Sequence, residues 1–221
     1  MTQPSRPSAH EYLAAIYEMN EENIPPVQAA LARWMGVTPA SVSEAVKRLR
    51  RDGMVRTQGR ELTFTKQGEA VARQLVRRHR LAERFLIEVI GLAWHRAHEE
   101  AGAWEGVISD EVEARISTIL DDPATCPHGN PIPDSKHRVD QSGLKPLRSF
   151  GPGDRVVLER LTEDLELDLG VMRYFEDNGL MPGAQILVGG VAPDGTMTLE
   201  VDGNRVGLGP DLTDNLWVRA A

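Results

Sequence analysis

The pattern of apolar residues changes about halfway along the chain. Up to about residue 122 apolar residues recur at helical spacing, as they do over 12–17. A stretch rich in proline and glycine follows over 124–153, and short β-type runs such as 185–188 and 196–201 then alternate with turn signals. The sequence therefore predicts a mainly α chain that ends in a small antiparallel β-domain.

The charge of the chain is divided as unevenly as its apolar pattern. The net charge of −8 over 221 residues argues against a protein that is basic throughout. Residues 28–80, however, carry twelve basic and four acidic side chains, whereas residues 151–221 carry five basic and thirteen acidic ones. A segment with a local charge of +8 therefore remains a candidate for binding a polyanion.

This basic segment contains the spacing of a helix-turn-helix. Ala32 is small enough for a helix crossing, Gly36 can adopt the positive φ of the turn, and Val42 can pack the second helix back onto the first. Two strand-like pieces follow at 54–57 and 61–65, as in the wing of a winged helix. A helical hairpin with a solvated basic face is the alternative.

The second helix of this motif offers polar side chains first and basic ones later, which suits contact with bases and then with phosphates. The candidate DNA-contacting residues are Gln28, Thr38, Pro39, Ser41, Ser43, Glu44, Lys47, Arg48, Arg51 and, at the wing tip, Arg60.

Imidazoles and carboxylates share helix faces further along the chain. His79 and Glu83 are one turn apart, and His98 and Glu105 are two turns apart on the next predicted helix. Such a set suits a divalent metal such as Mn²⁺, Fe²⁺ or Zn²⁺. Solvated surface side chains are the alternative, because His and Glu are common on exposed helix faces.

Several local motifs together resemble the diphtheria toxin repressor family of iron- and manganese-dependent regulators. They are the runs RHRLAER at 78–84, IGL at 90–92, HEEA at 98–101, ISDEVE at 108–113 and GNPIP at 129–133. The resemblance implies a homodimer that binds a palindromic double-stranded operator. It also implies a winged helix-turn-helix at 1–75, a helical metal-binding and dimerisation domain at 76–140, a linker at 141–149 and an SH3-like, FeoA-like β-barrel at 150–221.

The resemblance also implies a set of metal ligands. His79, Glu83 and His98 match one family site, which two side chains of the SH3-like domain complete. Alignment puts Asp168 at the first of these two positions and Val171, which cannot ligate, at the second. We therefore expect Asp168 to be the cross-domain ligand, with Glu166 as a neighbour that could replace it.

The second site of the family departs from the family pattern in this chain. Glu11 and Glu105 match two of its positions, but Gly102 and Gly106 stand where relatives place ligands. Two glycines inside a helix cost about 1 kcal/mol each relative to alanine. We expect this site to be lost, or rebuilt as a weaker oxygen-rich site of Glu11, Glu105 and His10.

Without a thiolate, the surviving set favours Mn²⁺ or Fe²⁺ over Zn²⁺. Cys126, the only cysteine, and His128 lie in a Pro- and Gly-rich segment and are predicted to be loop residues without a ligand role.

The sequence thus predicts a metal-dependent transcriptional repressor and not an enzyme. A single cysteine indicates a reducing compartment, and no apolar run reaches the ~20 residues of a membrane span. The first residues lack an apolar signal core, so we expect a cytoplasmic protein. Two alternatives remain: a winged-helix regulator whose metal sites have decayed, and a metallohydrolase built on the histidines.

Overall fold

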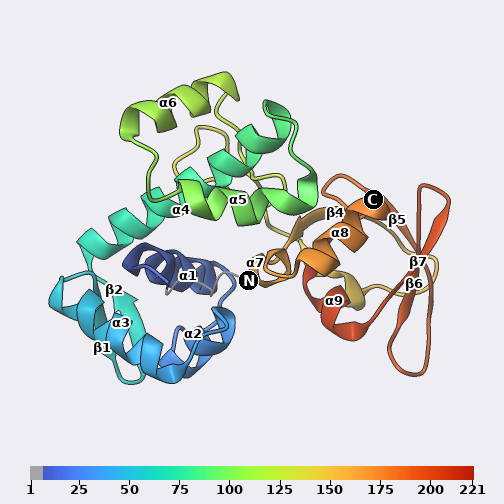
Figure 1. The fold of residues 1–221 in the computed structure, drawn as a ribbon. Coiled ribbons are helices and arrows are strands. Elements are labelled where there is room, and N and C mark those ends of the chain that lie inside the picture. Colours follow the sequence, from blue (N-terminus) through green and yellow to red (C-terminus); the bar gives the residue numbers. More distant parts are fainter. Residues whose placement is uncertain (1–6) are drawn as a thin grey trace. The chain divides into compact units, whose positions relative to one another are not determined.

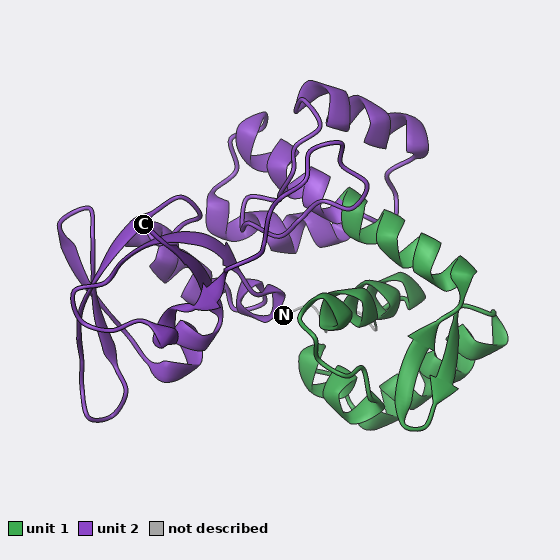
Figure 2. Ribbon diagram, turned by 180° about the vertical axis from the view of Figure 1, so that it is seen from behind, with its two compact units in different colours: residues 1–78 green, residues 79–221 purple. Residues whose placement is uncertain are grey.

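The computed structural model describes residues 7–221 and divides the chain into two compact units, residues 1–78 and 79–221 (Figure 2). One helix, α4 (Lys66–Glu88), begins in the first unit and ends in the second (Figure 1). Among the described residues, no helix is long and apolar enough to cross a membrane.

The first unit is a winged helix-turn-helix, as the sequence predicts. Its elements are α1 (Ala9–Glu21), α2 (Gln28–Trp34), α3 (Pro39–Arg51), β1 (Val55–Gln58), β2 (Glu61–Phe64) and the first part of α4. Gly36 between α2 and α3 has a φ of +62°. The side chain of Thr38 then accepts a hydrogen bond from the backbone N–H of Ser41 and caps α3, and Pro39 occupies its first position.

The core of this unit explains the helix-turn-helix spacing. Val42 and Leu49 of α3 are fully buried against Leu31 of α2 and Ile16 of α1. The β1–β2 hairpin turns through Gly59 and Arg60, which leaves Arg60 exposed at the wing tip. Burial of one face of α3 therefore presents its opposite face to solvent.

The second unit begins with a helical part. After α4 come a 3₁₀ turn, η1 (Trp94–Arg96), and the helices α5 (Ala97–Trp104) and α6 (Asp110–Ile119). The helix predicted to carry both His98 and Glu105 thus ends at Trp104, so that Glu105 lies just after α5. The expectation that Gly106 lies inside a helix is wrong, because it lies in the turn after α5, where its backbone freedom carries no helix penalty.

The C-terminal part of the second unit is built on one antiparallel sheet. Its strands run in the spatial order β3-β8-β4-β5-β6-β7. They are β3 (Lys145–Pro146), β4 (Arg155–Leu161), β5 (Gln185–Val191), β6 (Met197–Val201), β7 (Asn204–Leu208) and β8 (Leu216–Ala220). The turn η2 (Leu147–Ser149) and the helices α7 (Glu163–Glu166), α8 (Leu169–Asp177) and α9 (Pro210–Asp214) lie between them.

The expected antiparallel β-domain is present, and its six-stranded sheet is not closed into a barrel. Its edge strands β3 and β7 are not paired with each other. The short length of β3 accounts for this, since it has two residues and one of them is a proline without an N–H to donate.

A tryptophan from the helical part completes the core of the β-domain. Trp94 of η1 packs among the buried side chains of the sheet. The carboxylate of Glu176 on α8 accepts hydrogen bonds from the backbone N–H groups of Trp94 and His95, and it also pairs with the His95 ring. The two parts of the second unit are therefore packed together, and side chains from both can reach one site.

Candidate metal centre and DNA-binding surface

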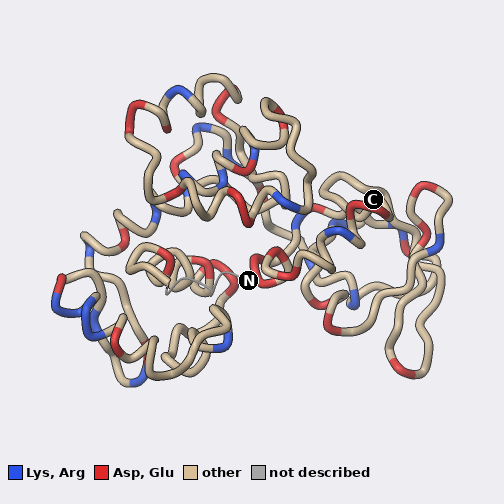
Figure 3. The backbone as a smooth tube through the Cα atoms, in the orientation of Figure 1, with Lys and Arg blue, Asp and Glu red and all other residues tan. Residues whose placement is uncertain are grey.

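The basic side chains of the first unit gather on α3 and on the wing (Figure 3). The candidates Gln28, Thr38, Pro39, Glu44, Lys47, Arg48, Arg51 and Arg60 are exposed, and Ser41 and Ser43 are half-buried. The structure thus places the predicted DNA-contacting residues where a duplex could reach them.

The second unit contains a buried group of ionisable side chains, which we call the histidine–glutamate cluster. His79 and Glu83 come from α4, His98 from α5, and Glu166 from α7. The full cluster consists of His79, Glu83, His98, Glu105, Cys126, His128, Glu163 and Glu166, of which His98 is the most exposed.

Three ligand atoms at the centre of the cluster form a nearly equilateral triangle. His79 Nε2 lies 3.2 Å from Glu83 Oε1 and 3.1 Å from His98 Nδ1, and the last two atoms are 3.2 Å apart. Ligands at right angles around an ion with bonds of about 2.2 Å would be separated by about 3.1 Å. The spacing of these three atoms therefore fits a divalent cation.

A second set of contacts extends the cluster toward α7 and the loop after α6. Glu166 Oε2 lies 3.1 Å from His98 Nδ1 and 2.7 Å from His128 Nδ1. Glu83, Cys126 and His128 place one ligand atom each within 4.8 Å of one another, and so do His98, Glu163 and Glu166. Donors of three chemical types, imidazole, carboxylate and thiol, thus converge here.

The carboxylates change the titration of the histidines. Burial by itself lowers the pKa of His79, but Glu83 and Glu105 raise that pKa well above its ordinary value. Burial likewise lowers the pKa of His98, and hydrogen bonds to Glu166 and Glu83 raise it to about 9. Without a cation, protons on the rings balance the buried negative charge, and a metal ion would have to displace them.

The pKa values of the acidic groups shift in different directions. Burial raises the pKa of Glu83, but His128 and His79 hold that pKa well below its ordinary value. Burial, followed by the charge of Glu83, raises the pKa of the Cys126 thiol to about 12.

Some polar atoms of the cluster have no hydrogen-bond partner although they are buried. They are Glu83 Oε2 and His128 Nε2. Leaving a buried polar atom unsatisfied costs about 1–3 kcal/mol, and more for a charged one. A bound cation would satisfy these atoms, so the residues fit a metal.

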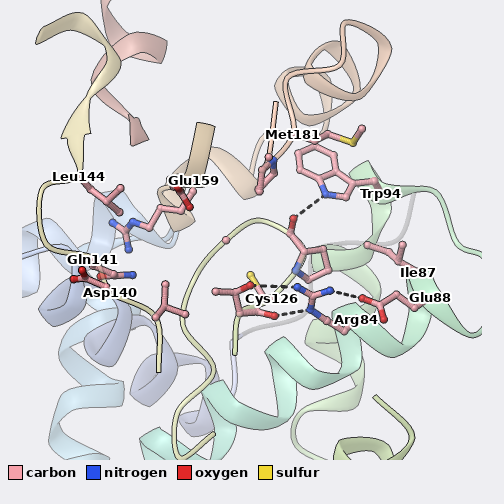
Figure 4. Close-up of a pocket in the computed structure, with 17 residues that line it drawn as sticks. Arg84, Ile87, Glu88, Trp94, Cys126, Asp140, Gln141, Leu144, Glu159 and Met181 are labelled. Carbon is pink, nitrogen blue, oxygen red and sulfur yellow. Dashed lines mark hydrogen bonds and ion pairs between the residues drawn. The ribbon is translucent and has the colours of Figure 1, made fainter. Parts of the chain in front are cut away.

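Polar contacts from the helices hold the loop that carries Cys126 and His128. Arg84 donates to the backbone oxygen of Thr125, and Trp94 Nε1 donates to the backbone oxygen of Pro127 at 3.2 Å. Figure 4 shows Arg84 between Glu88 and this loop, beside a cavity of about 410 Å³ whose lining includes Cys126. The loop is thus held in place by side chains of α4 and η1.

The expected cross-domain ligand Asp168 is not in the cluster. Its Oδ1 accepts hydrogen bonds from the backbone N–H groups of Gly170, at 2.9 Å, and Val171, at 3.1 Å. Asp168 is exposed and caps α8, so its assignment as a ligand is corrected. Glu166, the neighbour named as its substitute, lies in the cluster.

Of the residues expected in the oxygen-rich site, Glu11 and His10 lie in the first unit and Glu105 lies in the second. Glu105 pairs with His79, with Oε2 and Nδ1 3.0 Å apart. Glu11 instead accepts a hydrogen bond from the backbone N–H of Ser8 and completes the capping box of α1, and His10 is exposed. Gly102 is exposed on α5 and supplies no side chain.

The expectation that Cys126 and His128 have no ligand role conflicts with their surroundings. Both lie in a loop, as predicted, but they are 1% and 0% exposed and face Glu83. The premise that no thiol is available as a ligand is therefore wrong, because Cys126 lies in the cluster. Their Cys-x-His spacing next to Gly129 was the available signal, although it is weak without the fold.

Comparison with known proteins matches nearly the whole chain. Residues 6–61 match the N-terminal DNA-binding domain of iron-dependent repressors, residues 65–134 their metal-binding and dimerisation domain, and residues 145–220 the FeoA domain. The iron-dependent repressor IdeR of Mycobacterium tuberculosis is 37% identical over 203 residues, which cover 87% of this chain and 88% of that protein. The chain belongs to the diphtheria toxin repressor family.

Two further proteins are similar to this chain over nearly its whole length. The diphtheria toxin repressor of Corynebacterium diphtheriae is 34% identical over 219 residues, or 94% of each chain. A solved structure described as a manganese-dependent transcriptional repressor complex with manganese is 30% identical, has a TM-score of 0.84 and covers 97% of this chain and 100% of that one. The predicted family is confirmed, and because it consists of transcriptional repressors, the metallohydrolase alternative is set aside.

Proposed function

We propose that this chain represses transcription when Mn²⁺ or Fe²⁺ occupies the histidine–glutamate cluster, and that it binds a palindromic operator as a homodimer. The observation that carries the proposal is the convergence of buried imidazole, carboxylate and thiol groups, among which Glu83 Oε2 and His128 Nε2 have no hydrogen-bond partner. The basic face of α3 and the membership in a family of metal-dependent repressors support the DNA-binding half of the proposal.

The cluster has ligands for two neighbouring cations. We assign His79, Glu83 and His98 to one position, with Glu166 close to His98. Glu83, Cys126 and His128 form the other, and Glu83 belongs to both. A cation supplies the positive charge that the buried carboxylates lack once the histidines are neutral.

Helix α4 provides the path from the cluster to the DNA-binding unit. Ala72 and Leu75 of α4 pack in the core of the first unit, and His79 and Glu83 follow on the same unbroken helix. Displacement of the α4 backbone by ligand binding would therefore also displace residues that hold the winged helix.

The assignment predicts that a His79→Ala variant loses its response to metal. Coupling between two sites typically changes affinity by about 5- to 150-fold, so Mn²⁺ should raise operator affinity of the native protein by such a factor. In the variant we expect less than about a twofold rise, because one of the three ligand atoms of the triangle is removed. Fluorescence anisotropy with labelled operator, with and without Mn²⁺, measures both.

His137→Ala is the matched control, since His137 is an exposed loop histidine. It should respond to Mn²⁺ as the native protein does. A normal response in His79→Ala would refute the ligand assignment. Native protein that binds operator equally well with and without Mn²⁺ or Fe²⁺ would instead favour the regulator with decayed metal sites.

Cobalt(II) can test the second position, because Cys126 is the only cysteine of the chain. A thiolate bound to Co²⁺ gives an intense near-ultraviolet charge-transfer band, and coordination deprotonates the thiol despite its raised pKa. We expect this band in the native protein at two Co²⁺ per chain. Cys126→Ser should bind one Co²⁺ without the band, and native protein lacking the band would exclude Cys126 as a ligand.

We further assign residues 1–75 to DNA binding, 76–140 to metal binding and dimerisation, 141–149 to a linker and 150–221 to the FeoA-like domain. Because a repressor must reach DNA, we place the chain in the cytoplasm.

A further inference from the structure

One acidic residue lies on the face of α3 that points away from the core. The buried side of α3 consists of Val42, Ala45, Val46 and Leu49. At 100° per residue, the positions opposite this side are Ala40, Glu44, Lys47 and Arg51, and all four are exposed. Glu44 is the only acidic residue of the helix.

The place of Glu44 along the helix decides which part of a duplex it can meet. In helix-turn-helix proteins the N-terminal residues of the recognition helix contact base edges, and later residues reach the phosphates. Glu44 lies in the N-terminal half of α3, one turn after Ala40, and Lys47 and Arg51 follow it. A carboxylate near phosphates would be repelled, whereas one inside the groove can accept a hydrogen bond from a base.

The hydrogen-bonding groups that the four bases present in the major groove show which base a carboxylate can bind best. An ionised carboxylate only accepts hydrogen bonds. Guanine presents two acceptors there, thymine an acceptor and a methyl group, and adenine a donor beside an acceptor, whereas cytosine presents its N4 amino group as a donor. Building on the operator binding proposed above, we propose that Glu44 recognises a cytosine in each half-site of the operator.

The isosteric variant Glu44→Gln gives the sharpest test. A glutamine side chain pairs with adenine through two hydrogen bonds, to N6 and N7, so the variant should exchange one base and leave the rest of the operator unchanged. Operators are selected from a random double-stranded pool with Mn²⁺ present, once with each protein. We expect cytosine with the native chain and adenine with the variant at one position of each half-site.

Binding to the two selected operators then gives the size of the effect. A good base contact discriminates by about 5- to 150-fold, so the native chain should prefer the cytosine operator by such a factor and the variant should lose or reverse that preference. Lys47→Gln is the control on the same face. It should weaken binding to both operators about equally and reduce the log–log salt slope by about one.

Two results would overturn the proposal. If Glu44→Gln binds every sequence more tightly with the same base preference, Glu44 only repels DNA. If the selected sequences and affinities are unchanged, Glu44 does not face a base.

Discussion

Replacing Gly129 with alanine should lower the free energy of unfolding of the second unit by about 3–5 kcal/mol, because backbone strain and overcrowding add together at this position. Gly129 has a φ of +92°, a backbone conformation that residues other than glycine rarely adopt. A Cβ at Gly129 would lie 2.1 Å from the backbone oxygen of Glu159 and 2.6 Å from Cα of Arg160. Neither is a flexible side-chain end, so the loop or strand β4 must move.

The same substitution should weaken metal binding. The N–H of Gly129 donates to the backbone oxygen of Cys126 at 3.0 Å, and the Cys126 N–H donates to the oxygen of Asn130 at 2.8 Å. These bonds form the turn that positions His128. Displacement of the turn moves Cys126 and His128 relative to Glu83, so we expect the Co²⁺–thiolate band to weaken as well.

Gly153→Ala is the matched control. Gly153 has nearly the same φ, +93°, but a Cβ there would meet no atom within 4 Å. Gly153→Ala should lower the free energy of unfolding only by the backbone strain, about 1–3 kcal/mol, and should leave Co²⁺ binding normal. Denaturant unfolding of metal-free protein measures both variants, and equal losses would show that the close approach of Gly129 to β4 does not matter.

Raising the salt concentration from about 50 to about 200 mM should weaken operator binding by roughly 10³- to 10⁴-fold. Neutralisation of six to eight phosphates gives a log–log slope of about −5 to −7. The basis is the charge of +8 over residues 28–80, with exposed basic side chains on α3 and the wing. Anisotropy titrations at several salt concentrations give the slope.

Variants that each remove one basic side chain show which residues contribute to the salt dependence of operator binding. Arg60→Gln at the wing tip should make the slope shallower by about one. Arg205→Gln on β7 changes the net charge equally but lies outside the DNA-binding unit, so it should leave the slope unchanged. A nearly flat salt dependence of the native protein would contradict the assignment of α3 and the wing to phosphate contact.

The local elements of the DNA-binding unit could be predicted because each has a local cause. Gly36 needs a positive φ, Thr38 and Pro39 begin a helix, and Val42 and Leu49 repeat at helical spacing. These signals depend on neighbours a few residues away, so they can be recognised without knowledge of the tertiary structure.

The metal centre could be predicted only where its residues share a helix. His79 and Glu83 are one turn apart on α4, and that spacing alone puts them on one face. His128 lies 45 positions after Glu83 in a loop without periodicity, and its approach depends on Arg84 and Trp94 holding that loop. No local pattern contains such information.

The error at Asp168 has a different origin. The alignment with the family points to the segment that contains both Glu166 and Asp168. The course of the backbone decides which of these two carboxylates lies in the cluster. Asp168 stands where α8 begins and its short side chain caps the exposed N–H groups, whereas Glu166 ends α7 and is buried beside His98. Helix boundaries therefore decide which acid reaches the cluster, and boundaries are the part of a sequence prediction most easily shifted.

The position of Trp94 in the core of the β-domain has a consequence for how the chain folds during synthesis. The β-domain buries an indole that precedes its first strand by about 50 residues, and Glu176 reaches back across 82 positions to bond the Trp94 backbone. Contacts of such high sequence separation form slowly. The helical part is synthesised first, and Trp94 therefore lacks its complete core until the strands of the β-domain have been made. During this interval the exposed indole puts the helical part at its greatest risk of misassembly.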